Sequence, residues 1–220
     1  MLNDDVRATK ERYSKRYKQF GVTPKTLGWD KGKQEVRFDV LTSQYCFEQK
    51  SILDIGSGFG DLLITLRKKA SLFNYTGIEV VDALADRARE LHPGDEFITG
   101  DFDEYNFNSQ FDYCIASGIF NHKMKQDNYR FIKNSMHKAW EISNDGFAFD
   151  FLSDKVEYQL EHTFHSSPSK VLDFAYTLSR NVILRNDYMP FEFSVFVFKD
   201  DSFNVEDTLF SKYKRQAGEK

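Results

Sequence analysis

The sequence predicts an α/β fold with a doubly wound, mainly parallel sheet of seven strands, one of them antiparallel near the C-terminus. Short apolar runs alternate with helical segments between residues 51 and 152, and this alternation is typical of right-handed βαβ crossovers. The first apolar run is followed at once by a glycine-rich turn and a helical segment. Two late apolar runs flank a turn at 186–190, which indicates a hairpin and therefore one antiparallel strand.

The chain begins with two segments that are expected to be helical and to form a lid. Residues 4–19 are polar and helix-prone, and residues 34–48 carry apolar side chains near helical spacing. Segments of this kind commonly fold over a bound ligand, and Gly28 and Gly32 in the loop between them suit a hinge. Residues 1–48 are therefore expected to be an N-terminal helical lid segment.

The ligand-binding core is expected at residues 49–152, where strands and helices alternate. Apolar runs predict strands at 51–55, 75–80, 96–99, 111–116 and 146–152. Amphipathic spacing predicts the intervening helices at 61–70, 82–91 and 127–142. A polar and aromatic stretch, 153–180, is expected to be an insertion on the substrate side, and 181–200 to hold the hairpin strands 182–184 and 192–198. These parts form a single domain, since 220 residues suit one core.

Composition restricts the class of protein and of partner. The 22 Phe and 11 Tyr residues supply apolar area for a core, which a disordered chain would lack. The formal net charge of −4 makes nucleic acid an unfavoured partner, because phosphate binding usually needs a basic face. Cys46 and Cys114 lie in apolar contexts and predict neither a disulfide framework nor a zinc site. Without a signal-peptide pattern or a run of about 20 apolar residues, a cytoplasmic protein with no membrane partner is expected.

The strongest functional signal is a glycine-rich turn between the first strand and its helix, Asp54-Ile-Gly56-Ser-Gly58-Phe-Gly60. Glycines there let a ligand approach the backbone, and the following helix presents free N–H groups. Glu79, at the end of the second strand, stands roughly 20 residues downstream, where such folds place the acid that holds a ribose hydroxyl pair. Asp101 follows the third strand and is placed for an adenine amino group, with Asp103 as its rival. Three strand ends therefore predict a nucleoside-type ligand at one edge of the sheet.

The segment ILDIGSGFGDLL resembles the first motif of the class I S-adenosylmethionine (SAM)-dependent methyltransferases, which have a Rossmann-like fold. The resemblance runs from residue 51 to residue 152, and the terminal hairpin matches the family's antiparallel strand. The sequence departs from the commonest form of the motif at Ser57, where many members carry Cys or Ala. The dehydrogenase pattern G-x-G-x-x-G does not fit, because the third glycine comes one residue early.

The resemblance implies SAM as the cofactor and gives a role to each part of the site. Asp54 and the glycine loop would contact the methionine part of SAM, Glu79 would bind both ribose hydroxyls, and Asp101 would bind the adenine. Arg37 or Gln34, in the segment before the motif, would reach the methionine carboxylate. The expected cofactor-binding residues are Asp54, Gly56, Ser57, Gly58, Gly60, Glu79, Val80, Asp101, Phe102, Ala116, Ser117 and Arg37.

Catalytic residues are less specified, because methyl transfer from a sulfonium needs mainly an in-line nucleophile and sometimes a base. His122, after the fourth strand, and His162, in the 153–180 stretch, are the candidates, and each has a surface or structural role as its alternative. His162 and His165 could share a helix face, yet no third ligand stands beside them, so no metal site is expected. The lid adds candidates for the substrate side: Tyr13, Tyr17, Trp29, Lys31 and Phe38.

The sequence favours a methyltransferase that transfers a methyl group from SAM to O or N of a small-molecule metabolite. Two alternatives stay open: a protein or RNA methyltransferase, and a non-catalytic SAM-fold partner protein. The segment SGIFNHK after the fourth strand lacks the prolines of the amino-methylating nucleic-acid enzymes, which lowers the nucleic-acid alternative. The acceptor atom, the need for a base and the oligomeric state are not specified by these residues.

Overall fold

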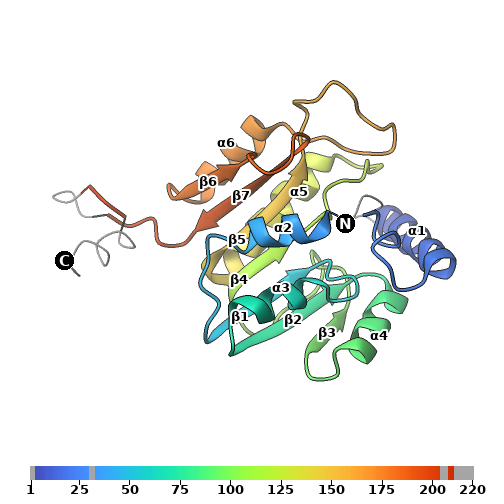
Figure 1. Cartoon of the computed structure of the whole chain (residues 1–220). Helices are drawn as coiled ribbons and strands as arrows, with labels where there is room; N and C mark the ends of the chain where they lie inside the picture. Colours follow the sequence, from blue (N-terminus) through green and yellow to red (C-terminus); the bar gives the residue numbers. More distant parts are fainter. Residues whose placement is uncertain (1–2, 30–32, 204–207, 211–220) are drawn as a thin grey trace.

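A computed structural model describes residues 3–29, 33–203 and 208–210 of the chain. Its central feature is a seven-stranded sheet with the strand order β3-β2-β1-β4-β5-β7-β6 (Figure 1). Strand β7 is antiparallel to both of its neighbours, and the other neighbouring strands are parallel. The strands are β1 (Lys50–Ile55), β2 (Phe73–Glu79), β3 (Glu96–Thr99), β4 (Phe111–Ala116), β5 (Ser143–Leu152), β6 (Val182–Arg185) and β7 (Glu192–Phe198). This topology confirms the fold class expected from the sequence.

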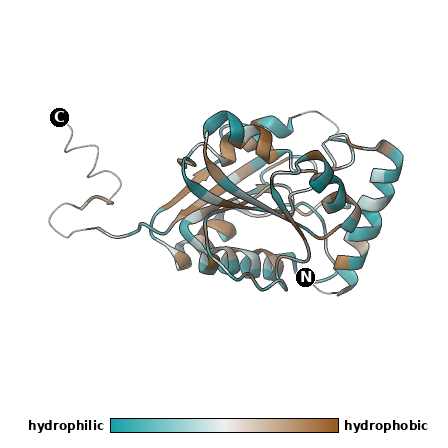
Figure 2. Cartoon of the chain, turned by 90° about the horizontal axis from the view of Figure 1, so that it is seen from below, coloured by the Kyte–Doolittle hydropathy of each residue, from teal (hydrophilic) through white to brown (hydrophobic). Residues whose placement is uncertain are grey.

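Helices cover both faces of the sheet. Helices α5 and α6 pack on one face, and α2, α3 and α4 pack on the other. None of the helices within the described ranges is long and apolar enough to cross a bilayer. The helices are α1 (Asn3–Phe20), α2 (Gln34–Leu41), α3 (Leu62–Lys69), α4 (Asp82–Leu91), α5 (Asn128–Ile142) and α6 (Pro168–Leu178). Hydrophobic and hydrophilic residues alternate around them, as expected for helices with one buried face (Figure 2).

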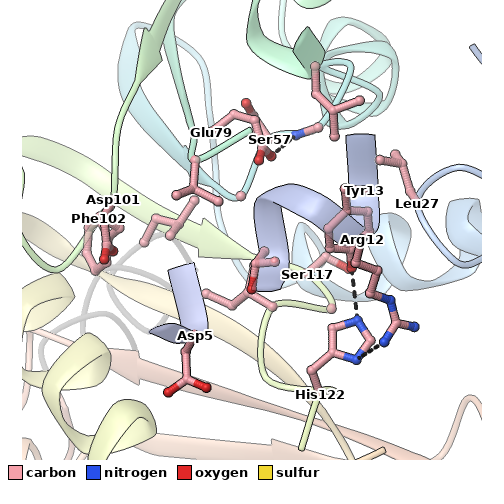
Figure 3. A pocket seen from close by; sticks show the side chains of 18 of the residues that line it. Asp5, Arg12, Tyr13, Leu27, Ser57, Glu79, Asp101, Phe102, Ser117 and His122 are labelled. Atoms are coloured by element: carbon pink, nitrogen blue, oxygen red, sulfur yellow. Dashed lines mark hydrogen bonds between the residues drawn. The ribbon is translucent and has the colours of Figure 1, made fainter. Parts of the chain in front are cut away.

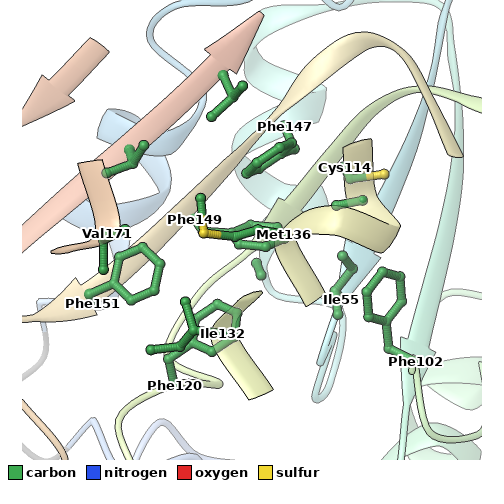
Figure 4. Packing of buried hydrophobic residues seen from close by; sticks show 14 of the residues in the cluster. Ile55, Phe102, Cys114, Phe120, Ile132, Met136, Phe147, Phe149, Phe151 and Val171 are labelled. Atoms are coloured by element: carbon green, nitrogen blue, oxygen red, sulfur yellow. The ribbon is translucent and has the colours of Figure 1, made fainter. Parts of the chain in front are cut away.

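Alternation along the strands divides the core into two layers. In β5, the side chains of Phe147, Phe149 and Phe151 belong to the layer under α5 and α6, while Ala148 belongs to the opposite layer. Figure 4 shows the three phenylalanines packed beside Met136 of α5. These rings are at most 1% exposed, so the abundant phenylalanine of the sequence forms the centre of the fold.

Most element bounds agree with the sequence expectation, and α2 is shorter. The strands at 96–99, 111–116 and 192–198 and the helix at 82–91 have the expected limits. Helix α2 was expected to reach residue 48 but ends at Leu41. The chain turns there because Tyr45 is held against the sheet: its ring stacks on Tyr113 at 4.3 Å, and its hydroxyl donates to the Phe147 carbonyl at 2.6 Å.

The 153–180 stretch contains a helix, α6, that the sequence expectation omitted. Pro168 occupies the first turn of α6, where its missing N–H costs nothing, and Ser167 precedes it. Val171 and Ala175, four residues apart, are fully buried against the sheet. Helix α6 therefore forms the crossover between β5 and β6, and only the preceding residues, at 161 and 162, reach the cavity described below.

Candidate functional site

A cavity of about 660 Å³ lies at the carboxyl ends of the central strands, with α1 along one wall (Figure 3). The strand order changes direction here, between β1 and β4, which is where open α/β sheets bind ligands. The expected cofactor-binding and catalytic residues that line it are Asp54, Gly56, Ser57, Gly58, Glu79, Val80, Asp101, Phe102, Ser117, His122 and His162. Three of the expected cofactor residues, Gly60, Ala116 and Arg37, are not among the lining residues.

The glycine turn after β1 requires glycine at the positions that face the cavity. Gly56 and Gly58 have φ angles of 73° and 57°, a region that side chains with a Cβ rarely adopt. A Cβ on Gly56 would lie 2.4 Å from Ile119 Cγ2. Gly60 also has a positive φ, of 83°, but a Cβ there would meet the rings of Phe97 and His92. Gly60 therefore allows close packing behind the turn and does not face the ligand space.

Glu79 ties the end of β2 to the glycine turn. One carboxylate oxygen accepts from the Gly58 N–H at 2.9 Å, and the other accepts from the Val81 N–H at 2.8 Å. Burial raises the pKa of Glu79, and the backbone N–H groups oppose that effect by stabilising the ionised form. Each oxygen keeps a further lone pair, so the side chain can both hold the turn and accept from a ligand.

Asp54, at the end of β1, is the second buried acid of the cavity. Its carboxylate accepts from the Tyr75 hydroxyl at 2.7 Å. Burial raises the pKa of Asp54 to about 7, and the neighbouring Glu79 charge acts in the same direction. Two closely spaced buried acids create a demand for positive charge in this part of the cavity.

The loop after β3 distinguishes Asp101 from its rival Asp103. Asp101 and Phe102 line the cavity. Asp103 is not a lining residue: its carboxylate accepts from the Ser135 hydroxyl of α5 at 3.0 Å. Asp101 is therefore the acid of this loop that lines the cavity.

After β4 the chain is held by an acid that the sequence did not single out. Asp150 of β5 accepts from the Ser117 hydroxyl and from the Gly118 N–H, both at 2.6 Å. Ala116 is fully buried at the end of β4, so it supports this turn from behind. The register of β4 and β5, with Ala116 opposite Phe149, explains why Asp150 falls beside Ser117. Strand pairing is what brings them together, and the linear sequence does not show it.

Arg37 is engaged elsewhere than expected. Its guanidinium pairs with both carboxylate oxygens of Glu192 in β7, and it lies over the ring of Trp29 at 3.8 Å. Burial raises the pKa of Glu192 to about 7, and Arg37 opposes this. The side chain thus lies behind Trp29, which itself lines the cavity. Of the two residues proposed for the methionine carboxylate, Gln34 is the one at the cavity wall.

His122 lines the cavity, but its two ring nitrogens are already in use. Arg12 lies 2.9 Å from Nδ1 and the Tyr13 hydroxyl 3.2 Å from Nε2. Because arginine can only donate, Nδ1 must be the acceptor, and Nε2 then carries the proton and donates to Tyr13. The lone pair that a general base would use is the one that accepts from Arg12. This geometry does not favour the expected role of His122 as a base and instead makes it a positioning residue for Arg12.

The two histidines of the 153–180 stretch lie in different places. His162 is exposed at the cavity rim, whereas His165 bonds to the Ser153 carbonyl at 2.6 Å and is not a lining residue. Within the described ranges, no group of three or more His, Cys, Asp or Glu side chains is arranged to hold a metal ion. Lys31 and the expected hinge at Gly32 lie outside the described residues.

Sequence reasoning named Tyr13 of α1 as a candidate but missed the rest of the helix face that lines the cavity. That face consists of Asp5, Ala8, Thr9, Arg12 and Tyr13, at three- and four-residue spacing. That spacing was visible in the sequence, but a mainly polar helix face is expected to be exposed to solvent unless the position of the helix is known. Tyr17 lies one turn further along and packs on Phe59.

The pKa of His122 gives a testable consequence for stability. Burial, followed by the nearby Arg12 charge, lowers this pKa from 6.5 to about 4. As pH falls, the unfolded chain therefore takes up this proton first, and folding stability falls between pH 6.5 and 4. Between pH 7 and 5, denaturant unfolding should lose about 2 kcal/mol more in the wild type than in His122→Gln. The same pH dependence in both proteins would contradict the assignment.

Comparisons with known proteins agree with this geometry. A family model for a methyltransferase domain matches residues 52–139, which include the glycine turn, Glu79 and Asp101. A protein of Mycobacterium tuberculosis that is named as a proposed methyltransferase (Rv1506c) is 28% identical over 158 residues, covering 68% of this chain and 93% of its own.

Two solved structures show the same fold at low sequence identity. Magnesium protoporphyrin IX methyltransferase (ChlM) from Synechocystis with bound SAM has a TM-score of 0.63 and 11% identity, covering 89% of this chain and 97% of its own. The DhpI complex with S-adenosylhomocysteine (SAH) has a TM-score of 0.62 and 14% identity, covering 87% of this chain and 93% of its own. The methyltransferase-domain match, the strand-end turn and the fold agree with the resemblance to the class I SAM-dependent methyltransferases that the sequence indicates.

Proposed function

We propose that the protein transfers the methyl group of SAM to an oxygen or nitrogen of a small molecule, and that both reactants share the cavity at the strand ends. The observation that carries this proposal is the convergence of the glycine turn, Glu79 and Asp101 on one cavity. Its volume of about 660 Å³ falls within the usual range for small-molecule and cofactor sites.

The residues present suit a cationic nucleoside. Gly56 and Gly58 line the cavity in a left-handed backbone conformation, so backbone and no side chain faces a ligand at these positions. The buried acids Asp54 and Glu79 match a ligand that carries a sulfonium and an ammonium group. An exposed backbone turn beside buried acids suits a ligand that carries both polar groups and positive charge.

Each part of the cavity wall has a distinct task in this proposal. Glu79 binds the ribose hydroxyls, Asp101 and Phe102 contact the adenine, and Asp54 with the turn at Gly56 holds the methionine portion. SAM, when bound, supplies a methyl group on a positively charged sulfur. The chain then has to hold the acceptor in line with that methyl group and to exclude water.

Helix α1, within the proposed 1–48 lid segment, closes the cavity over these groups. Asp5 accepts from the Lys125 N–H at 2.9 Å, Lys10 pairs with Asp82 at 2.9 Å, and Arg12 donates to His122. Tyr13 and Tyr17 also pack on a small apolar cluster that is separate from the two main core layers. A helix attached outside the main core can release and admit ligand without disturbing that core. A covered cavity of this size suits a small acceptor better than a protein or RNA strand.

Isothermal titration of SAM into the wild-type protein tests the cofactor part, and we expect one site per chain. Absence of binding would contradict the proposal. Release of SAH in the presence of a small-molecule library then tests the acceptor part. Methylation of tRNA or peptide substrates but of no small molecule would contradict it.

A further inference from the structure

Arg12 is a half-buried cation on the cavity wall that has no acidic partner among the described residues. Its one hydrogen-bond partner in the described part of the chain is the neutral imidazole of His122, at 2.9 Å. No ion pair joins it to a carboxylate among those residues. Burial lowers the pKa of Arg12, as expected for a guanidinium that has lost water without gaining an anion.

The surroundings hold the guanidinium in place and leave most of its donors free. A guanidinium has five N–H donors in a planar fork, and His122 accepts from one of them. His122 is itself fixed by the Tyr13 hydroxyl at 3.2 Å. Arg37, by contrast, donates from Nε and Nη2 to the two carboxylate oxygens of Glu192 and is thereby neutralised. An arginine that is oriented but not neutralised is a typical site for a planar oxyanion.

Among the described residues, the acids that line the cavity, Glu161 beside His162 included, form no ion pair with Arg12. Glu79 and Asp101 lie across the cavity from Arg12 and His122, on the side proposed for the cofactor (Figure 3). Asp5, on the same helix as Arg12, instead accepts from the Lys125 backbone. The cavity wall also carries apolar side chains, together with Lys123 and Lys125; the apolar ones include Trp29, Ile119, Met124 and Phe131.

We propose that Arg12 binds an oxyanion of the methyl acceptor, so that the substrate is a small acid, such as a carboxylate, with an apolar body. An anion at Arg12 would repay the desolvation of the guanidinium, and the apolar wall would receive the rest of the molecule. The cavity is positive at Arg12 and negative at Asp54 and Glu79. This arrangement favours an anionic acceptor beside Arg12 and a cationic cofactor beside the two acids. This inference rests on the proposed function and names its substrate class.

Paired probes test the inference. Benzoate and benzamide have the same shape and differ in charge, and each is titrated into SAH-loaded protein by calorimetry. Benzoate should bind about tenfold or more tighter than benzamide to the wild type. Arg12→Gln should reduce this preference to about threefold or less, and Arg12→Lys should retain an intermediate preference because it keeps the charge and loses the fork. Arg7→Gln is the matched control, since Arg7 lies on the same helix, pairs with Asp4 and does not line the cavity.

Binding of SAH, measured on the same samples, separates the possible failures. If SAH does not bind the wild type, the proposed function fails. If SAH binds and benzamide equals benzoate, or the preference for benzoate survives in Arg12→Gln, the inference about Arg12 is wrong while the proposed function stands. Unchanged SAH affinity in Arg12→Gln also shows that the variant is folded.

Discussion

Glu79→Ala should weaken SAM binding by about 1–3 kcal/mol, or roughly 5- to 150-fold. Two losses contribute. The ribose would lose a charged acceptor, and the glycine turn would lose the carboxylate that accepts from the Gly58 N–H at 2.9 Å. Titration calorimetry of SAM into the purified variant measures the effect, with circular dichroism as a check that the variant is folded.

A surface acid on the neighbouring strand provides the matched control for Glu79. Glu96 is the first residue of β3 and therefore lies at the opposite end of the strand from the cavity. It is exposed and accepts from the Thr76 hydroxyl at 2.8 Å. Glu96→Ala should leave SAM affinity unchanged. Equal affinity in a folded Glu79→Ala variant and the wild type would remove Glu79 from the cofactor site.

Arg37→Met should lower the free energy of unfolding by about 3–5 kcal/mol near pH 8, because it leaves Glu192 buried without its counter-charge. Glu192 is 2% exposed, and Asp150 is a second buried acid close enough to raise its pKa. Since that pKa is already about 7, removal of Arg37 raises it further, and the loss should be smaller at pH 5, where the carboxyl is protonated. Chemical denaturation at the two pH values measures the difference.

The double variant Arg37→Met/Glu192→Leu is the control for the ion pair. Replacement of both partners by apolar side chains removes the uncompensated charge, so it should recover much of the lost stability. If the single variant is as stable as the wild type and binds SAM weakly, then Arg37 contacts the cofactor carboxylate as the sequence suggested, and the ion pair has no structural role.

The sheet was predictable from the sequence because each strand is a short apolar run that ends at a turn residue. The 111–116 run precedes Ser117 and Gly118, and the 96–99 run precedes Gly100, so local composition was enough to set their limits. Helix α6 was not predicted because its first turn is polar and its buried side chains, Val171 and Ala175, are small. A helix of this length is stabilised mainly by packing against the sheet, and that packing cannot be deduced from one sequence.

The site residues also fall into two groups, those that the sequence could predict and those that it could not. Glycines and acids at strand ends are brought together by the fold class itself, so Gly56, Glu79 and Asp101 could be assigned to one place before the structure was known. Arg37 could not be assigned, because its partner Glu192 is 155 positions away in the sequence. Arg12 was missed for a related reason: a basic residue on a polar helix is expected in solvent until α1 is placed over the cavity.

A crystal structure of the complex with SAH tests the central claim most directly. We expect the adenosine to lie between the glycine turn and the loop at Asp101 and Phe102, with both ribose hydroxyls within hydrogen-bond distance of the Glu79 carboxylate. The sulfur should face the space toward Arg12. Electron density for SAH outside this cavity, or a ribose with no contact to Glu79, would contradict the account.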